Sequence, residues 1–412
     1  MMAPIMMAPM MKYLAIGLLW VVCPWVAPAA AESYRFGAVW DGDKVWKDAC
    51  ITVQGEHIER VGACPAGALN LSRYTAIPGM IDVHTHMTYV FENKVSRPGR
   101  GAAVVFLAQD NARKTLETGV TTVRDLGAQN YADIAMRDLI GLGQMRGPRM
   151  FVAGYGLSAP RPGRPTSPNS AKGVDEVAKV VRQQVDAGAD WIKMYGSTGS
   201  GQDVSGTQTY TFDEMKAAVD AAHAAGKRIA IHSYGPDGAR DAIRAGADSL
   251  EHATDMDDET IAEMVRRKIF YVPTIDHNRY YADNYVKLNY PPAAVEGLNG
   301  FVQRNLETAR KAFRAGARFA MGSDAVYTMF GENTRELGWF VKAGMTPEQA
   351  LRAATAGGAE LLGMETRLGA IRTGYLADIA AVEGDPLANI EVAIGKVRWV
   401  MKAGEVVVDK TR

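Results

Sequence analysis

Two histidines separated by one residue follow the short apolar segment 80–83 of the chain. Alternate side chains of a strand face the same side, so His84 and His86 would point together. Two imidazoles on one side suit a divalent metal ion such as zinc. Alone, this short motif fits ordinary polar residues at a strand end equally well. Other potential ligands, however, follow other apolar segments in the same way: Lys193, His232, His252 and Asp324.

The segments that carry these residues belong to a repeated pattern of helix and strand. Helical stretches that end in glycine and lead into a short apolar strand recur at Gly119, Gly188, Gly226, Gly246 and Gly316. Glycine closes a helix because it adopts the left-handed conformation without steric cost. Strands that alternate with helices pair in parallel through crossovers, which predicts an α/β fold.

The number of expected strands favours a closed barrel. About eight are expected, the number in a (β/α)₈ TIM barrel. A doubly wound open sheet is the alternative, but no GxGxxG motif follows its first strand. The expected strands are 81–83, 120–123, 150–153, 191–194, 228–231, 249–250, 270–274 and 318–321.

A barrel would bring the six candidate residues together, because barrel active sites are built at the carboxyl ends of the strands. Each candidate also has an ordinary explanation. Lys193 could extend its amine to solvent, and His232 and His252 could be hydrogen-bonded core residues. Asp324 could cap the helix that follows its strand. The joint pattern, which includes four of the seven histidines of the chain, favours a metal site.

The two ends of the chain show short strands separated by turns instead. We expect residues 32–76 and 376–412 to pair into a small β-domain of β-sandwich architecture, and residues 77–375 to form the barrel. Cys50 and Cys64 flank a predicted hairpin of this domain. The sequence leaves open whether they form a disulfide or remain free thiols.

The first 31 residues have the features of a secretory signal peptide. Lys12 precedes the apolar run 13–22, which is too short to span a bilayer, and residues 29–31 are alanines suited to cleavage. We therefore expect a secreted or periplasmic protein that has no membrane contact after cleavage. Basic and acidic residues number 46 each, so no charge excess favours a nucleic-acid partner. The expected partner is a small-molecule substrate, and a homo-oligomer is compatible with the sequence.

Two further motifs carry a resemblance to a known family. The segment 76–86 reads AIPGMIDVHTH, and the segment 374–379 reads GYLADI. Together with Lys193, His232, His252 and Asp324 in this order, they resemble the amidohydrolase superfamily. The most similar subgroup is that of the imidazolonepropionase-like proteins, which includes Xaa-Pro dipeptidases. The resemblance covers nearly all of the chain that follows the signal peptide.

The resemblance implies a hydrolase with two divalent metal ions, for which zinc is the expected metal. His84, His86 and Asp324 would hold one ion, and His232 and His252 would hold the other. Lys193 would bridge both ions as an N6-carboxylated lysine, a modification favoured by the lowered pKa of an amine in an apolar strand. A metal-bridging hydroxide would attack the substrate, with Asp324 as the catalytic group that accepts and returns the proton.

Three residues are candidates for substrate binding: Tyr234, which follows His232 by two positions, and His277 and Arg279 in a segment expected to be a loop after the seventh strand. The long loop at 158–172 could cover the site, but it contains Arg161 and Arg164 and lacks the histidine often found there in the subgroup. We expect cleavage of a C–N bond, as by a dipeptidase or an N-acyl amino acid hydrolase. The alternatives are a mononuclear deaminase or cyclic imide hydrolase, a lactonase or esterase, and a non-catalytic binding protein.

Overall fold

The computed structural model describes residues 31–90, 101–160 and 167–411. Its centre contains eight parallel strands in two sheets, one ordered β5-β6-β7 and one ordered β12-β11-β10-β9-β8. All eight strands predicted from the sequence are present. They are β5 (Met80–Thr85), β6 (Val120–Asp125), β7 (Arg149–Val152), β8 (Trp191–Tyr195), β9 (Arg228–Ser233), β10 (Ser249–His252), β11 (Phe270–Val272) and β12 (Arg318–Phe319).

Backbone hydrogen bonds join the two sheets at both of their edges. At one edge the Val83 amide of β5 donates to the Met321 carbonyl just after β12, over 2.8 Å. At the other edge the Leu157 amide, which follows β7, donates to the Lys193 carbonyl of β8 over 2.8 Å, and the Tyr195 amide donates to the Leu157 carbonyl over 2.9 Å. The carboxyl ends of β5 and β12 are therefore neighbours, although they lie far apart in the sequence.

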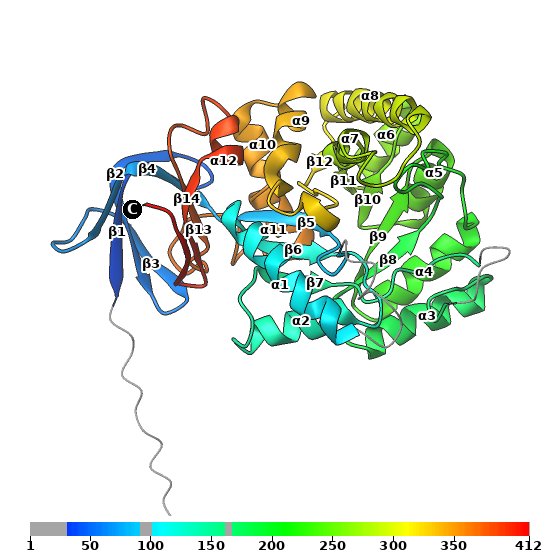
Figure 1. The fold of residues 1–412 in the computed structure, drawn as a ribbon, viewed down its shortest axis with the longest axis horizontal. Helices are drawn as coiled ribbons and strands as arrows, with labels where there is room; N and C mark the ends of the chain where they lie inside the picture. The colour runs from blue at the N-terminus through cyan, green and yellow to red at the C-terminus, as the bar shows by residue number, and fades with distance from the viewer. Residues whose placement is uncertain (1–30, 91–100, 161–166, 412) are drawn as a thin grey trace, which may run out of the picture.

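Helices surround these strands (Figure 1). Each of the five glycines predicted to end a helix has a positive φ, as the left-handed conformation requires. A continuous apolar core lies between the helices and the strands, and a second buried cluster combines side chains of the strands with residues of α11. The helices are α1 (Gly101–Glu117), α2 (Ala132–Gly141), α3 (Val174–Asp186), α4 (Phe212–Ala224), α5 (Pro236–Ala245), α6 (Asp258–Arg266), α7 (Ile275–Asp283), α8 (Ala293–Arg314), α9 (Glu336–Lys342), α10 (Pro347–Ala353), α11 (Ala356–Leu362) and α12 (Glu391–Gly395).

The two ends of the chain meet in a seven-stranded sheet on one side of the molecule (Figure 1), with the order β15-β14-β13-β4-β1-β2-β3. This sheet has its own buried cluster, centred on Phe36 and Trp399. The pairing of both chain ends agrees with the expectation, while the domain boundaries and the sandwich architecture stay predictions. The strands are β1 (Glu32–Trp40), β2 (Val45–Gln54), β3 (His57–Gly62), β4 (Leu69–Pro78), β13 (Ile379–Val382), β14 (Val397–Lys402) and β15 (Glu405–Asp409).

Cys50 and Cys64 form a disulfide bond. Cys50 lies in β2, and Cys64 follows β3, which pairs antiparallel with β2. The register, which the sequence could not supply, places their Cα atoms 4.9 Å apart, within the range that a disulfide spans. Of the two possibilities left open by the sequence, the structure therefore has the disulfide.

One expected element is different. Residues 276–281 were expected to form a loop, but they lie in α7, whose first turn is stabilised by the Glu336 carboxylate. This carboxylate accepts from the Ile275 and Asp276 amides over 2.9 Å each, a capping interaction from a distant helix that no local motif announces. The predicted signal peptide lies outside the described residues except for its last, Ala31. Within the described ranges, none of the helices combines the length and apolarity needed to cross a membrane.

Candidate metal centre

The six predicted metal ligands converge in one place. All six are buried and line a single cavity of about 920 Å³. They come from the carboxyl ends of five different strands, or from the residues just beyond: His84 and His86 at β5, Lys193 in β8, His232 in β9, His252 in β10 and Asp324 after β12. The parallel arrangement of the strands therefore gathers residues that are up to 240 positions apart.

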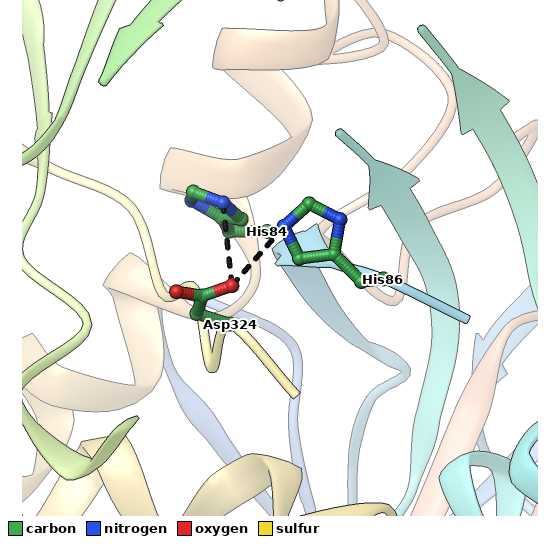
Figure 2. A group of neighbouring side chains, drawn as sticks. All are labelled: His84, His86 and Asp324. Carbon is green, nitrogen blue, oxygen red and sulfur yellow. Dashed lines mark ion pairs between the residues drawn. The ribbon is translucent and has the colours of Figure 1, made fainter. Parts of the chain in front are cut away.

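His84, His86 and Asp324 form the tightest group, shown in Figure 2. One ligand atom from each residue lies within 4.8 Å of the other two. The Oδ1 atom of Asp324 is 3.3 Å from His86 Nε2 and 3.6 Å from His84 Nε2. Two imidazole nitrogens and a carboxylate oxygen around a common point are a donor set that zinc and similar ions accept.

Lys193 lies beside this group. Its Nζ atom is 3.3 Å from His84 Nε2, and the residue is only 1% exposed. Burial lowers the pKa of Lys193 from 10.5 to about 8, because a charged ammonium loses its hydration there. A substantial fraction of the amine is therefore neutral near physiological pH and able to act as a nucleophile.

The hydrogen bonds of the histidines leave their inner nitrogens available. In three of the rings, Nδ1 lies within hydrogen-bond distance of an oxygen outside the cluster, and in His84 and His86 the Nε2 atom faces the Asp324 carboxylate. This arrangement of an outer acceptor and an inner lone pair is typical of metal-binding histidines. The three contacts are His84 with Glu251 Oε2 at 2.7 Å, His86 with the Gly127 carbonyl at 3.0 Å, and His252 with Thr274 Oγ1 at 2.6 Å.

Two buried polar atoms in the cluster test whether a metal ion fits. His232 Nε2 and Asp324 Oδ1 are inaccessible to solvent and have no hydrogen-bond partner among the described residues. Leaving a buried polar atom unpaired is costly, so such atoms call for an explanation. A bound cation would satisfy both, because Asp324 Oδ1 lies beside His84 and His86, and the His232 ring lies against the His252 ring with 4.4 Å between centroids. The donor set therefore fits a metal centre.

The electrostatics of the cluster favour the protonation states that metal ligands need. Burial lowers the pKa of His84 to about 4, and burial likewise holds the pKa of His232 and His252 well below 6.5, so these rings are neutral. Burial alone would raise the pKa of Asp324, but the nearby imidazoles, led by His277, outweigh it and hold that pKa well below 3.8. Burial alone would lower the pKa of His86, but the contact with Asp324 outweighs it and raises that pKa above 6.5. The cluster thus presents three neutral imidazoles, one carboxylate, and a fourth imidazole that pairs with this carboxylate.

The backbone turns sharply where two of these ligands lie. His252 has a φ of 73° and Asp324 a φ of 51°, both in the left-handed region that residues other than glycine rarely adopt. Such strained residues persist where surrounding contacts hold them, and they are concentrated at functional sites. The strain allows each side chain to leave its strand end and point toward the cluster.

Two buried carboxylates behind the ligands were missed by the sequence analysis. Glu251 contacts His84 and is fully buried. Asp82, also fully buried, accepts from the His84 and Ser323 amides and from the Ser323 hydroxyl, so it fastens the end of β5 to the segment that carries Asp324. The one available signal was their position next to or near predicted ligands, in SLEH and IDVHTH.

The three predicted substrate-binding residues have different locations. Tyr234 lines the cavity, and its ring stacks on His232 with 5.0 Å between centroids. His277 also lines the cavity but binds a ligand residue: its Nδ1 atom is 2.8 Å from the Asp324 carbonyl and its Nε2 atom 3.2 Å from Asp324 Oδ2.

Arg279 is not brought to the site. It is absent from the described residues that line the cavity, and its guanidinium is engaged by the carboxylates of Asp276, Asp283 and Glu332. The expected loop is a helix, so the side chain of Arg279 contacts Asp276, one turn before it, and Asp283, one turn after it. The predicted role of Arg279 in substrate binding is not supported by this geometry.

The walls of the cavity contain further residues that the sequence did not indicate. They include the tyrosines Tyr89, Tyr195, Tyr281 and Tyr327. Residues 158–159 and 167–170 of the loop after β7 also line the cavity, as the expectation of a covering loop requires. Arg161 and Arg164 lie outside the described residues.

Comparisons with known proteins show the family to which the chain belongs. The chain matches the model of the amidohydrolase family over residues 75–407. A solved Xaa-Pro dipeptidase with methionine bound in its active site is 31% identical and superposes with a TM-score of 0.83, covering 92% of this chain and 99% of that one. A solved prolidase in complex with N-methylphosphonate-L-proline is 26% identical, with a TM-score of 0.84 and coverage of 92% and 100%.

Ochratoxinase from Aspergillus niger is 29% identical over 354 residues, which cover 77% of this chain and 72% of that protein. The superfamily and the dipeptidase-related subgroup predicted from the sequence are thus both found among the relatives. The family match extends over most of the chain and includes all six clustered residues. The chain belongs to the amidohydrolase family and is a hydrolase that acts on carbon–nitrogen bonds.

Proposed function

We propose that this enzyme hydrolyses an amide or peptide bond of a small substrate in an active site that holds two divalent metal ions, with zinc as the expected metal. The observation that carries the proposal is the convergence of six candidate ligand residues on one cavity, where two buried atoms, His232 Nε2 and Asp324 Oδ1, have no hydrogen bond among the described residues. The parallel strands bring the residues at their carboxyl ends to one face, and the residues found there are of the types that bind divalent metals, four of them histidines.

The proposed scaffold is a closed (β/α)₈ barrel. Eight parallel strands with hydrogen bonds at both sheet edges support closure, and the solved relatives share the fold over more than nine-tenths of the chain. In such barrels the catalytic residues lie at the carboxyl ends of the strands, which is where the cluster lies. The sheet formed by the chain ends would be the companion β-domain.

Within the proposed site, His84, His86 and Asp324 would hold one ion, and His232 and His252 the other. Lys193 would be N6-carboxylated and bridge the two. Its neutral amine fraction can react with carbon dioxide, and the carbamate formed supplies anionic oxygens in a pocket rich in imidazole. The position of Lys193 Nζ, 3.3 Å from His84 Nε2, supports this role.

The bound ions would supply an activated water nucleophile at neutral pH and would polarise the scissile carbonyl. Asp324 would accept the proton of the attacking water and return it to the leaving nitrogen. Its Oδ1 atom faces His84 and His86, its Oδ2 atom lies 3.2 Å from His277 Nε2, and its own backbone carbonyl accepts from His277 Nδ1 over 2.8 Å, so the residue is enclosed by imidazoles. Burial raises the pKa of Tyr234, so its hydroxyl stays protonated; it donates to Asn278 Oδ1 over a long 3.4 Å and would turn from there to donate to the substrate oxygen.

The substrate class we propose is a dipeptide or an N-acyl amino acid. The relatives support this, since two are named as an Xaa-Pro dipeptidase and a prolidase, and the second binds a proline phosphonate. A cavity of about 920 Å³ lies at the upper end of the range for small-molecule sites, which leaves space for an acyl or side-chain group beyond a dipeptide backbone. Its tyrosines would contact the apolar part of the substrate.

We also propose that the enzyme acts in a secreted or periplasmic compartment. The predicted signal at residues 1–31 motivates this, and the Cys50–Cys64 disulfide supports it, because such bonds persist in oxidising environments. The test is the N-terminal sequence of the protein recovered from the outside of the cell, which should begin at Glu32.

The metal proposal is tested by the metal content of the purified enzyme and of Lys193→Ala. Lys402→Ala serves as the matched control, because Lys402 is a largely buried lysine that donates to the Gly147 carbonyl away from the cavity. We expect about two ions per chain in the wild type and the control, and loss of one or both in Lys193→Ala.

The other outcomes identify the alternatives. One ion in all three proteins would contradict the bridging role of Lys193 and favour a mononuclear deaminase or cyclic imide hydrolase. An absence of metal would overturn the proposed centre. If metal is present, the metal-loaded enzyme should hydrolyse dipeptides and N-acyl amino acids, and the metal-free protein should not. Lactones and esters are the competing substrate class in the same assay.

A further inference from the structure

A buried polar network lies behind the metal ligands, in the interior of the strands. Arg124 of β6 and Glu251 of β10 form an ion pair at 2.8 Å in which both side chains have no solvent exposure. The other Glu251 oxygen, Oε2, is 2.7 Å from His84 Nδ1. An uncompensated charge at this depth would be strongly destabilising, so the two charges need each other.

We propose that Glu251, oriented by Arg124, is a positioning residue that keeps the proton of His84 on Nδ1 and thereby directs the Nε2 lone pair to the metal. This inference rests on the proposed metal centre and goes beyond it, because it assigns a role to two residues that are not ligands themselves. Glu251 contacts the His84 ring, and Arg124 acts through Glu251. The argument follows from which atoms can donate and which can accept.

The two oxygens of Glu251 have separate tasks. Oε1 accepts from Arg124 Nη2 over 2.8 Å and from the Ser249 hydroxyl over 2.5 Å. Oε2 is left to accept from His84 Nδ1. A guanidinium can only donate, so it always requires an acceptor at the Oε1 position. An ionised carboxylate can only accept, so His84 must place its proton on Nδ1.

Arg124 is held so that it cannot turn away. Its Nε atom donates to the Val83 carbonyl over 2.6 Å, and its Nη1 atom donates to the Ser249 hydroxyl over 2.9 Å. Its guanidinium also lies over the Trp191 ring, 4.4 Å from the centroid. These contacts fix the position of the carboxylate relative to β5, the strand that carries His84, since Val83 is the preceding residue of that strand.

The decisive substitution is Glu251→Gln, which keeps the shape but makes one of the two positions a donor. Arg124 would still require the amide oxygen at the Oε1 position, so the NH₂ group would face His84 Nδ1. His84 would then have to accept at Nδ1 and carry its proton on Nε2, where the metal ion should bind. We expect zinc affinity to fall about 10- to 100-fold, as for other outer partners of metal-binding histidines.

A second substitution should reverse the first. In the double variant Arg124→Met/Glu251→Gln, the guanidinium is gone and the glutamine amide can turn, so its oxygen can again accept from His84 Nδ1. Zinc affinity should rise by about tenfold or more relative to Glu251→Gln alone. A role confined to the stability of the fold would not give this recovery, because the double variant has lost more of the buried network than the single one.

The experiment measures zinc dissociation constants by chelator competition and, in the metal-free proteins labelled with ¹⁵N-histidine, the nitrogen of His84 that carries the proton. Asp378→Asn is the control, because Asp378 is a buried carboxylate in a two-point ion pair with Arg149, remote from the cavity. We expect the Glu251→Gln spectrum to show the proton moved to Nε2, and the control to keep wild-type zinc affinity.

The outcomes separate this inference from the metal centre on which it rests. If the wild type binds no zinc, the proposed function fails and this inference fails with it. If the wild type binds zinc and Glu251→Gln binds it equally tightly, the metal centre stands and the positioning role is overturned. Weak binding by both the single and the double variant, with the His84 proton still on Nδ1, would also overturn it.

Discussion

Gly199 should be nearly irreplaceable, because its backbone touches the ring of a residue at the active site. The loop after β8 crosses Tyr234 at this point, and a Cβ atom added to Gly199 would lie 2.4 Å from two atoms of the Tyr234 ring. The ring has no room to retreat, since it packs on His232 on one side and on Phe301 on the other, with centroids 5.0 and 4.4 Å away. We predict that Gly199→Ala both destabilises the protein and displaces Tyr234.

The expected magnitude has two parts. Gly199 has a φ of 115°, where an alanine is strained by about 1–3 kcal/mol. The overlap with the Tyr234 ring adds about 1–3 kcal/mol, the usual cost of overfilling a packed interior. Gly173 isolates the first part, because its φ is 87° and a Cβ atom there would meet no atom within 4 Å. Gly199→Ala should therefore lower the free energy of unfolding by about 1–3 kcal/mol more than Gly173→Ala.

Stability and activity together test this reasoning. Denaturant unfolding of the two alanine variants gives the difference in stability, and kcat/KM on an accepted dipeptide gives the effect on the site. Gly173→Ala should leave kcat/KM unchanged, and Gly199→Ala should reduce it. Combining Gly199→Ala with Tyr234→Phe should cost less activity than the sum of the two single changes, because both act through the same ring. Equal stability of the two alanine variants, or strictly additive losses of activity, would refute the reasoning.

Three other predictions concern the site and its support. Only the neutral amine of Lys193 reacts with carbon dioxide, and burial lowers its pKa to about 8. In ¹³C-labelled bicarbonate the carbamate signal should therefore grow as the pH rises from about 6 to 9. A signal that does not change with pH would contradict the carboxylation. Replacing Cys50 and Cys64 by serine should lower the free energy of unfolding by about 2–4 kcal/mol, measured by denaturant unfolding, since the bond links residues 14 positions apart. Arg279→Ala should destabilise by about 1–3 kcal/mol, because the buried Asp276 carboxylate loses one partner and keeps Arg335 and Trp339, and KM should stay within about twofold. A large rise in KM would restore its predicted role at the substrate.

The strands and the ligands were predictable because both follow local rules. A helix that ends in glycine and leads into a short apolar strand leaves a periodic trace in the sequence, and each of the eight expected segments is a strand. In parallel βα units the carboxyl end of every strand is at the same face, so polar residues there can be assigned to one site without any knowledge of their distances. His84, His86 and Asp324 were found in this way.

The position of Arg279 outside the cavity has a physical cause. The segment after β11 contains no helix-start signal of its own, because the groups that cap α7 belong to Glu336, which is 60 or more residues away. Once the segment is helical, the side chain of Arg279 meets Asp276 and Asp283, one turn before and after it, and its donors are satisfied there. Arg279 was a candidate because a charged side chain in an expected loop could reach the substrate. In the helix, its side chain is directed to Asp276 and Asp283 instead.

The residues that support the ligands pose a harder problem for sequence reasoning than the ligands do. Glu251 is adjacent to His252 in the sequence, yet its side chain contacts His84, 167 positions away. Successive side chains of a strand point to opposite faces, and the Glu251 side chain of β10 points to the face where His84 lies. Asp82 likewise reaches Ser323 across 241 positions. Both are carboxylates that would be unfavourable in an apolar interior unless a specific partner faces them, and the partner is defined only by closure of the sheets. An acidic residue next to a predicted ligand therefore indicates, from the sequence, that a ligand is held by a buried carboxylate. Only the structure shows which ligand each carboxylate holds.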